Sequence, residues 1–196
     1  MNILIGCEYS ATVRDAFIRR GHDAWSNDII DCEKGGPHLK MDIMDAIKIR
    51  KWDRIIIHIP CTAMAVCGNG TYAGTDERSN AIYWSASVWE AAVENSDWVV
   101  MENPASVLFP YLRTMYAADV QYIQPWQFGH PEQKKTGLAL HNAPRLKPTN
   151  DVKEYMMTLP TKERERIWYM SPGPDRQKER ARFFPGIADA MAEQWG

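Results

Sequence analysis

The stretches RIIIHIPC, at residues 54–61, and DWVVMENP, at residues 97–104, decide the fold. Each is a short, nearly continuous apolar run that ends in polar or reactive residues. Such runs are typical of strands covered on both faces of a parallel sheet. Residues 79–96, which lie between them, follow a helical pattern that Ser79 could cap. The apolar side of this helix is formed by Ile82, Ala86, Trp89 and Val93.

Towards the N-terminus, strand and helix patterns continue to alternate. Strands are predicted at residues 2–7 (NILIGC) and 23–30 (DAWSNDII), and helices at residues 12–22 and 42–52. Gly21 is placed to stop the first of these helices, and Asp42 to cap the second. The alternation predicts an α/β fold, with a mainly parallel sheet and helices on both faces.

The C-terminal half has weaker periodicity. A helix with a kink at Pro110 is predicted over residues 107–116, and late strands over residues 118–128 and 135–141. The Gly- and Thr-rich residues 67–78 are predicted to form a mobile loop, able to close over a substrate as a lid. We expect one catalytic domain over residues 1–196, with residues 144–182 as a small substrate-side appendage.

Composition restricts the class of protein. The 196 residues are 45% hydrophobic and 24% charged, which is ordinary for one globular domain. The net charge of -2 means that any binding of nucleic acid depends on a local patch. The N-terminus lacks the pattern of a signal peptide, and no apolar run is long enough to span a membrane. Four widely spaced cysteines do not suggest a disulfide framework, so we expect a cytoplasmic protein with reduced thiols.

Reactive groups follow the predicted strands. Ligands of open parallel sheets bind beyond the carboxyl ends of the strands, so the residues at those ends are the candidates. Residues 7–11 and Asp28 follow the first two strands, residues 58–62 follow RIII, and residues 102–104 follow WVVM. A thiol, at Cys61, and a carboxylate, at Glu102, thus come at the ends of two apolar strands.

The order of these motifs resembles the cytosine-5 DNA methyltransferase family. LIGCEYSATVRDAF is similar to the family's first motif, HIPCTA carries a Pro-Cys pair, and MENP a Glu-Asn pair. EQKKTGLAL is a loose match to a later motif with spaced basic residues, and ERARFFPGIADAMAEQW resembles the C-terminal motif. The resemblance covers most of the chain and implies a Rossmann-like fold that uses S-adenosylmethionine. Short phage-encoded chains are similar throughout, including the PWQFGH and PGP stretches, which implies evasion of host restriction.

The resemblance also implies roles for individual residues. Cys61 would be the nucleophile that adds to carbon 6 of cytosine, its loop fixed by Pro60 and oriented by Asn103. Glu102 would hold the ring nitrogen and the exocyclic amine. The residues expected to bind S-adenosylmethionine are Cys7, Glu8, Tyr9, Ser10, Asp28 and Asp42. The residues expected to bind DNA, single- or double-stranded, are Gln133, Lys134, Lys135 and Arg176. No metal ion is expected, because no CxxC pair supports Cys61, Cys67 or His58 as ligands.

The sequence departs from the family in ways that leave other functions open. Ala11 and Thr12 occupy the region of the Gly-rich turn, and Thr62 follows the cysteine where the family usually has Gln. The large segment that reads the target sequence is absent. The alternatives are a catalytically degenerate protein that binds S-adenosylmethionine or DNA, an enzyme acting on RNA or a free pyrimidine nucleotide, and a lyase or hydrolase that consumes the cofactor.

Several residues have a structural interpretation beside the functional one. Glu8 could bind the methionine amino group or stay in solvent, and Asp28 and Asp42 could cap helices. The Cys61 thiol is expected to ionise more readily than a free thiol, because helix N-termini and backbone amides stabilise its charged form. The tryptophans expected in the core are Trp84, Trp89 and Trp98. The basic run at residues 162–182 could be a solvated face or a nucleic-acid contact in which Trp168 and Tyr169 stack on bases.

Overall fold

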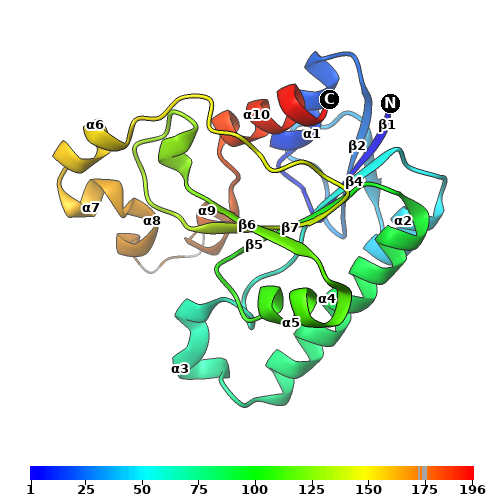
Figure 1. Ribbon diagram of the computed structural model, residues 1–196, viewed down its shortest axis with the longest axis horizontal. Coiled ribbons are helices and arrows are strands. Elements are labelled where there is room, and N and C mark those ends of the chain that lie inside the picture. Colours follow the sequence, from blue (N-terminus) through cyan, green and yellow to red (C-terminus); the bar gives the residue numbers. More distant parts are fainter. Residues whose placement is uncertain (172, 174–175) are drawn as a thin grey trace.

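The computed structural model describes residues 1–171, 173 and 176–196, and its centre is one seven-stranded sheet (Figure 1). The strand order is β3-β2-β1-β4-β5-β7-β6. The strands are β1 Asn2–Gly6, β2 Asp23–Asp28, β3 His38–Lys40, β4 Arg54–His58, β5 Val99–Pro104, β6 Asp119–Ile123 and β7 Thr136–His141. Strands β1 to β5 are parallel, and β7 runs antiparallel to both β5 and β6. The predicted α/β fold with a mainly parallel sheet is confirmed.

Helices cover both faces of the sheet. The longer ones are α1 Thr12–Arg19, α4 Asp76–Asn95, α5 Leu108–Tyr116 and α10 Pro185–Trp195. The shorter ones are α2 Ile43–Lys48, η1 Val66–Gly68, α3 Asn69–Tyr72, η2 Pro125–Gln127, α6 Lys153–Thr158, α7 Thr161–Arg164, α8 Arg166–Tyr169 and α9 Arg176–Ala181. Helices α1 and α10 pack side by side over one face, and α2, α4 and α5 lie on the other (Figure 1).

Alternation along β1 divides the core between these two layers. Ile3 and Ile5 pack with Phe17 of α1 in one apolar cluster, whereas Leu4 packs with α2 and α4 in the other. Successive residues of a strand point to opposite faces, so an apolar run of this kind needs cover on both sides. The same rule holds for β4, in which Ile55, Ile56 and Ile57 are all fully buried.

The Gly- and Thr-rich segment is more regular than the predicted loop. Residues 67–78 contain the end of η1, all of α3 and the beginning of α4. The N-cap of α4 is Thr75, whose side chain accepts a hydrogen bond from the Arg78 amide, so the predicted cap at Ser79 is wrong. The buried Arg78 guanidinium donates to the carbonyl of Ala63 at 2.7 Å and to Asn69 Oδ1 at 2.8 Å, which ties this segment to the loop after β4.

Two predictions of helix and strand shape are also corrected. Pro110 lies in the first turn of α5, where a missing N–H costs no helical hydrogen bond, so it does not interrupt the helix. The strand predicted over residues 118–128 ends at Ile123, because Pro125 cannot donate to the ladder and begins the short helix η2 instead.

The expected core tryptophans differ in burial. Trp89 is 2% exposed, as predicted, and Trp98 is partly buried against the core. Trp84 is 38% exposed on the outer side of α4, so its assignment to the core is wrong. The most buried tryptophan is one the sequence did not single out: Trp195 of α10 is fully buried, and its indole nitrogen donates to the Pro144 carbonyl at 2.9 Å.

We expect Trp195→Ala to destabilise the protein by about 3–5 kcal/mol, the usual cost of deleting a buried aromatic side chain. The substitution would also remove the edge-to-face contact with Trp98, whose ring centroid lies 5.2 Å away. Urea denaturation would measure the loss. Trp168→Ala is the matched control, because Trp168 is 62% exposed and its removal should change stability by less than about 0.5 kcal/mol.

The short helices α6, α7, α8 and α9 lie to one side of the sheet (Figure 1), whereas the residues that precede them pack on the main body, with Leu146 buried in the core. The appendage is joined to the loop after β6, where the Val152 amide donates to the Trp126 carbonyl at 2.8 Å. Residues 172, 174 and 175, which include both prolines of the PGP stretch, lie outside the described residues. Among the residues that are described, no helix is long and apolar enough to cross a membrane.

Candidate functional site

The loop after β4 places Pro60 and Cys61 at the carboxyl edge of the sheet. The amides of Met64 and Ala65 donate to the Cys61 carbonyl at 3.0 and 2.9 Å, so the cysteine begins a tight turn. On the neighbouring strand β5, the fully buried Asn103 donates from Nδ2 to the Ile59 carbonyl at 2.8 Å. This hydrogen bond fastens the cysteine loop to the end of β5.

The surroundings of Cys61 favour its neutral thiol. Cys61 is half-buried, and burial raises its pKa above the ordinary value. The charge of Glu102 raises it further, and the ammonium of Lys134 acts in the opposite direction. The prediction that Cys61 ionises more easily than a free thiol is therefore wrong. The loss of water around the sulfur raises its pKa by more than the nearby amides lower it. Lys134 is therefore the cation in position to support a thiolate.

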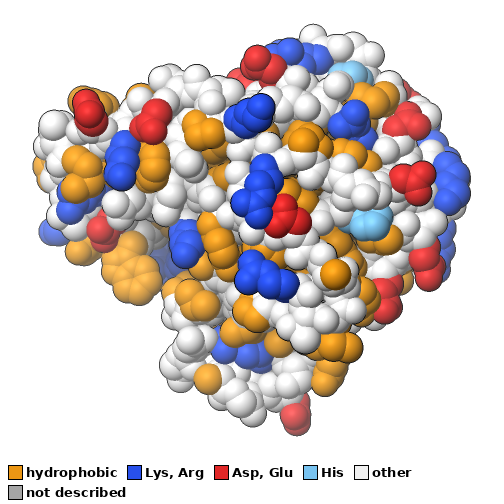
Figure 2. Space-filling model, in the orientation of Figure 1, with side chains coloured by type: hydrophobic (Ala, Val, Ile, Leu, Met, Phe, Trp, Pro, Cys, Tyr) orange, Lys and Arg blue, Asp and Glu red, His pale blue; other side chains and the backbone are white. Residues whose placement is uncertain are grey.

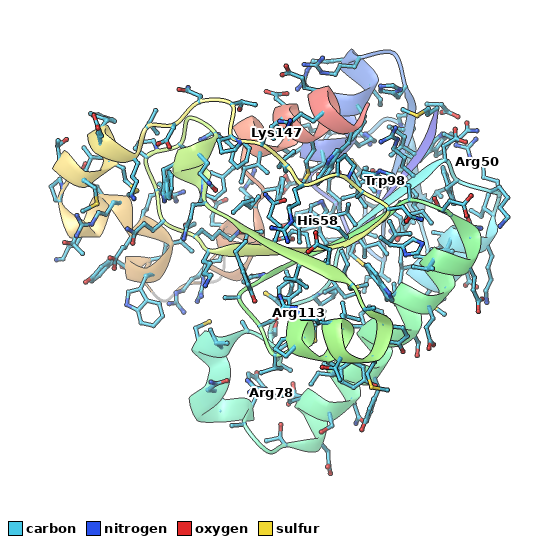
Figure 3. All side chains as sticks on the ribbon, viewed as in Figure 1. Arg50, His58, Arg78, Trp98, Arg113 and Lys147 are labelled. Carbon is cyan, nitrogen blue, oxygen red and sulfur yellow. The ribbon has the colours of Figure 1, made fainter. Side chains whose placement is uncertain are left out.

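Glu102 is paired with His58. The two residues are direct partners in the β4–β5 register, and His58 Nδ1 lies 3.0 Å from Glu102 Oε2. The side chains are 11% and 10% exposed. Figure 3 shows His58 in the middle of the molecule, whereas Arg50 and Arg78 lie towards its edge. The sequence places His58 among the strand-end candidates and weighs it as a metal ligand, but it does not indicate the pairing with Glu102.

The two adjacent lysines before β7 have different environments. Lys134 is half-buried, and its Nζ donates to the carbonyls of Arg180 at 2.8 Å and Arg182 at 3.4 Å. Burial lowers the pKa of Lys134, while the charges of Glu102 and Cys61 raise it. Lys135 is exposed, with its Nζ 4.4 Å from the Tyr122 ring. The structure thus brings Lys134, but not Lys135, into the electrostatic range of Cys61 and Glu102.

The other expected DNA contacts lie on the appendage side. Gln133 is exposed, and its amide donates to the Arg164 carbonyl at 2.6 Å. Arg176, at the beginning of α9, donates from Nε to the Met170 carbonyl at 3.0 Å. On the face shown in Figure 2, Lys and Arg side chains are interspersed with hydrophobic ones rather than gathered in one stripe.

The turn after β1 has two residues in the left-handed backbone region, Cys7 at φ 55° and Ala11 at φ 59°. Such angles favour glycine and cost a residue with a Cβ roughly 1 kcal/mol or more. Ala11 therefore takes a conformation to which glycine is better suited. Burial, followed by the charges of Asp28 and Asp42, raises the pKa of Cys7 to about 12. The carboxylates of Asp28 and Asp42, from separate strand ends, are thus within electrostatic range of Cys7.

Glu8 and Asp42 also have structural roles. Glu8 is 4% exposed, and its carboxylate accepts hydrogen bonds from the amides of Val13 at 2.7 Å and Arg14 at 3.2 Å. Because it caps the first turn of α1, the alternative that Glu8 stays in solvent is wrong. Asp42 caps α2 by accepting from the Met44 amide at 2.8 Å. Such capping occupies part of the lone-pair capacity of a carboxylate and leaves the rest for a ligand.

A cavity of about 290 Å³ adjoins the turn after β1 and is lined by Ser10, Thr12, Arg19, Lys34, Arg182, Phe183 and Pro185. A second cavity, of about 250 Å³, shares Arg182, Phe183 and Pro185 with it. The segment before α10 therefore lies between two hollows at the carboxyl edge of the sheet. Ser10 and Thr12 give the first cavity two hydroxyls, which can donate and accept hydrogen bonds to a polar ligand, whereas Asp28 and Asp42 lie outside the lining of both cavities.

Comparisons with known proteins identify the fold. No protein-family model and no curated protein matches the chain. A solved structure described as a DNA modification methyltransferase encoded within a prophage (E. coli) matches with a TM-score of 0.50 and 12% identity, over 71% of this chain and 46% of that one. The Entamoeba histolytica methyltransferase EhMeth matches with a TM-score of 0.52 and 11% identity, over 77% of this chain and 57% of that one.

These likenesses and the strand order define the class: the chain has the Rossmann-like fold of methyltransferases. The chain spans about half the length of the two solved structures that it matches. At such low identity the similarity establishes the fold alone, so activity has to be argued from the residues at the carboxyl edge of the sheet.

Proposed function

We propose that this protein transfers a methyl group from S-adenosylmethionine to carbon 5 of cytosine in DNA, through an adduct with Cys61. The observation that carries the proposal is that Cys61, Glu102 and Lys134 lie within electrostatic range of one another, beyond the ends of β4 and β5. A nucleophile, an acid that can protonate a ring nitrogen and a cation are the groups that such a reaction needs.

In the proposed reaction, the Cys61 thiolate adds to carbon 6 and makes carbon 5 enamine-like. Glu102 holds the ring nitrogen and the exocyclic amine. The hydrogen bond from Asn103 to the Ile59 carbonyl keeps the cysteine loop in place, and Pro60 restricts its backbone. After methyl transfer, the carbon 5 proton leaves to a base and the sulfur departs. Because the thiol of Cys61 is neutral in the free protein, its proton must be removed once the target cytosine is bound.

S-adenosylmethionine supplies an electrophilic methyl group on its sulfonium when bound. Asp28 and Asp42 would accept hydrogen bonds from its ribose hydroxyls and adenine amino group, beside Cys7. The turn with Glu8, Tyr9 and Ser10 would hold the methionine end. The cavity that Ser10 lines supports this assignment, since it lies between the turn and the C-terminal segment.

The proposed acceptor is DNA, single- or double-stranded. Lys134 would act on the base side, because it faces Glu102 and Cys61, while Gln133, Lys135 and Arg176 would contact phosphates. The exposed Trp168 and Tyr169 of the appendage could stack on unpaired bases. The prophage source of one solved structure with this fold supports a role in evading host restriction.

The proposal is tested by methyl transfer from labelled S-adenosylmethionine to unmethylated duplex DNA, single-stranded DNA and dCMP. We expect label in 5-methylcytosine with at least one DNA form. Transfer to dCMP alone would move the assignment to a free nucleotide. Cofactor binding in calorimetry, without transfer to any acceptor, would favour a catalytically degenerate binding protein. The raised pKa of Cys61 agrees with that alternative, because it makes the thiol a poorer nucleophile.

A further inference from the structure

The His58–Glu102 pair is built into the end of the sheet. Residues that are opposite each other in adjacent strands have side chains on the same face, so β4 and β5 present the imidazole and the carboxylate together. The preceding partners, Ile57 and Met101, are both apolar and fully buried. A buried polar pair does not stabilise the sheet more than an apolar pair would, because the cost of removing the two groups from water offsets most of their attraction.

The pair has a defined orientation. Since a carboxylate oxygen only accepts, the 3.0 Å contact requires His58 Nδ1 to carry the hydrogen and donate it to Glu102 Oε2. The opposite nitrogen, Nε2, is buried and has no hydrogen-bond partner among the described residues. The Phe183 ring packs edge-on against the imidazole, with centroids 4.8 Å apart. An aromatic wall and an opposing strand therefore hold this ring on two sides.

We propose that His58 is a positioning residue for Glu102, a role that rests on the proposed function. Its Nδ1–H occupies Oε2 and so directs Oε1 to the ring nitrogen of the target pyrimidine. The same hydrogen bond stabilises the carboxylate at the moment when Glu102 gives up a proton. A carboxyl group with one oxygen held can exchange a proton at the other without reorienting, which is how a preorganised site lowers a barrier.

The proton transfers of adduct formation involve only Cys61, Glu102 and the target cytosine. The thiol proton of Cys61 passes to Glu102 Oε1, and the sulfur forms its bond to carbon 6. The electrons of the C5=C6 double bond move to C4=C5, and those of C4=N3 come to rest on N3. N3 then takes the proton from Oε1, which leaves Glu102 as a carboxylate facing the His58 Nδ1–H. Lys134 is a charged group within electrostatic range of Glu102 in this site.

Two variants separate positioning from packing. His58→Asn keeps an N–H near the position of Nδ1, whereas His58→Leu fills similar space without a donor. The assay is the rate of covalent trapping on DNA carrying 5-fluorocytosine, at saturating DNA and S-adenosylmethionine, with DNA affinity measured separately. We expect the Leu variant to be slower by roughly 10²-fold with DNA affinity unchanged, and the Asn variant to recover most of the rate. Equal rates in the Leu variant and the wild type, or equal losses in Asn and Leu, would overturn the role.

A spectroscopic measurement keeps the inference testable apart from the proposed function. In the full-length wild type, the ¹⁵N spectrum of the histidine side chains should show His58 with hydrogen on Nδ1, and Glu102→Leu should move that signal. A His58 with Nδ1 unprotonated, or unaffected by Glu102→Leu, would contradict the pairing whatever the activity. If this signature is present but wild-type protein traps no DNA, then the proposed reaction fails and the positioning role fails with it, while the pairing stands.

Discussion

Cys61→Ser should abolish methyl transfer while leaving S-adenosylmethionine binding unchanged. A serine hydroxyl is far less acidic and less nucleophilic than a thiol, and removing the nucleophile from a site of this kind costs roughly 10⁴–10⁶ in rate. The carboxylates assigned to the cofactor lie at the end of β2 and after β3, and the cavity adjoins the turn after β1, so the exchange of sulfur for oxygen at Cys61 removes none of the groups proposed to bind the cofactor. Labelled transfer and calorimetry on the same preparation would measure both quantities.

Cys67→Ser provides the matched control. Cys67 is exposed in η1, six positions along the chain, and its sulfur lies 3.9 Å from an Arg180 nitrogen, a long contact. Its substitution should change the rate by no more than a few-fold. A Cys61→Ser protein that methylates DNA at the wild-type rate would end the adduct mechanism, and equal losses in the two variants would point to a shared effect on the loop.

The pH dependence of Cys61 alkylation follows from its environment. Burial and the charge of Glu102 raise the pKa of this thiol, so the reactive thiolate is scarce at neutral pH. The rate of reaction with iodoacetamide should therefore keep rising with pH beyond the point at which an ordinary thiol levels off. Peptide mapping would separate Cys61 from Cys67, and an early plateau for Cys61 would show that Lys134 outweighs burial.

The layers of this fold could be predicted because short-range patterns determine them. The three isoleucines of β4 and the WVVM run that leads into β5 are apolar on both faces of the strand. Only the centre of a parallel sheet buries both faces, so these strands could be predicted. Gly21 stops α1 with a φ of 82°, as its position after the helical pattern predicted. Periodicity was less informative for residues 67–78, where one buried arginine, Arg78, organises the chain through long-range bonds to carbonyls.

The candidate site was predicted in part, and the missing part depends on which side chains face each other. Strand ends gave Cys61 and Glu102, but no pattern in the sequence distinguishes Lys134 from Lys135, although one faces the site and the other faces solvent. The pairing of His58 with Glu102 depends on the register of two strands separated by a twenty-residue helix. Likewise, Glu8 caps α1 only because the turn brings its carboxylate back onto that helix.

Glu102→Gln should slow adduct formation by roughly 10²–10⁴-fold, the usual range for loss of a general acid. Glutamine has nearly the same shape, and its carbonyl oxygen can still accept the hydrogen bond from His58, so the arrangement of β4 and β5 is kept. What the amide cannot do is deliver a proton to the ring nitrogen when the sulfur adds to carbon 6. Rapid-quench measurement of trapping on 5-fluorocytosine DNA would isolate this step from product release.

Glu90→Gln is the matched control for charge and shape, because Glu90 is an exposed residue of α4 that bonds the Tyr116 hydroxyl at 2.8 Å, away from the site. It should trap DNA within about two-fold of the wild type. The charge of Glu102 also helps to keep Cys61 neutral, so Glu102→Gln should lower the pKa of that thiol and speed its alkylation at neutral pH. A variant that alkylates faster but traps DNA more slowly would therefore assign the loss to the missing proton and not to a less reactive cysteine. Trapping at the wild-type rate would instead show that Glu102 supplies no proton and that another group protonates the base.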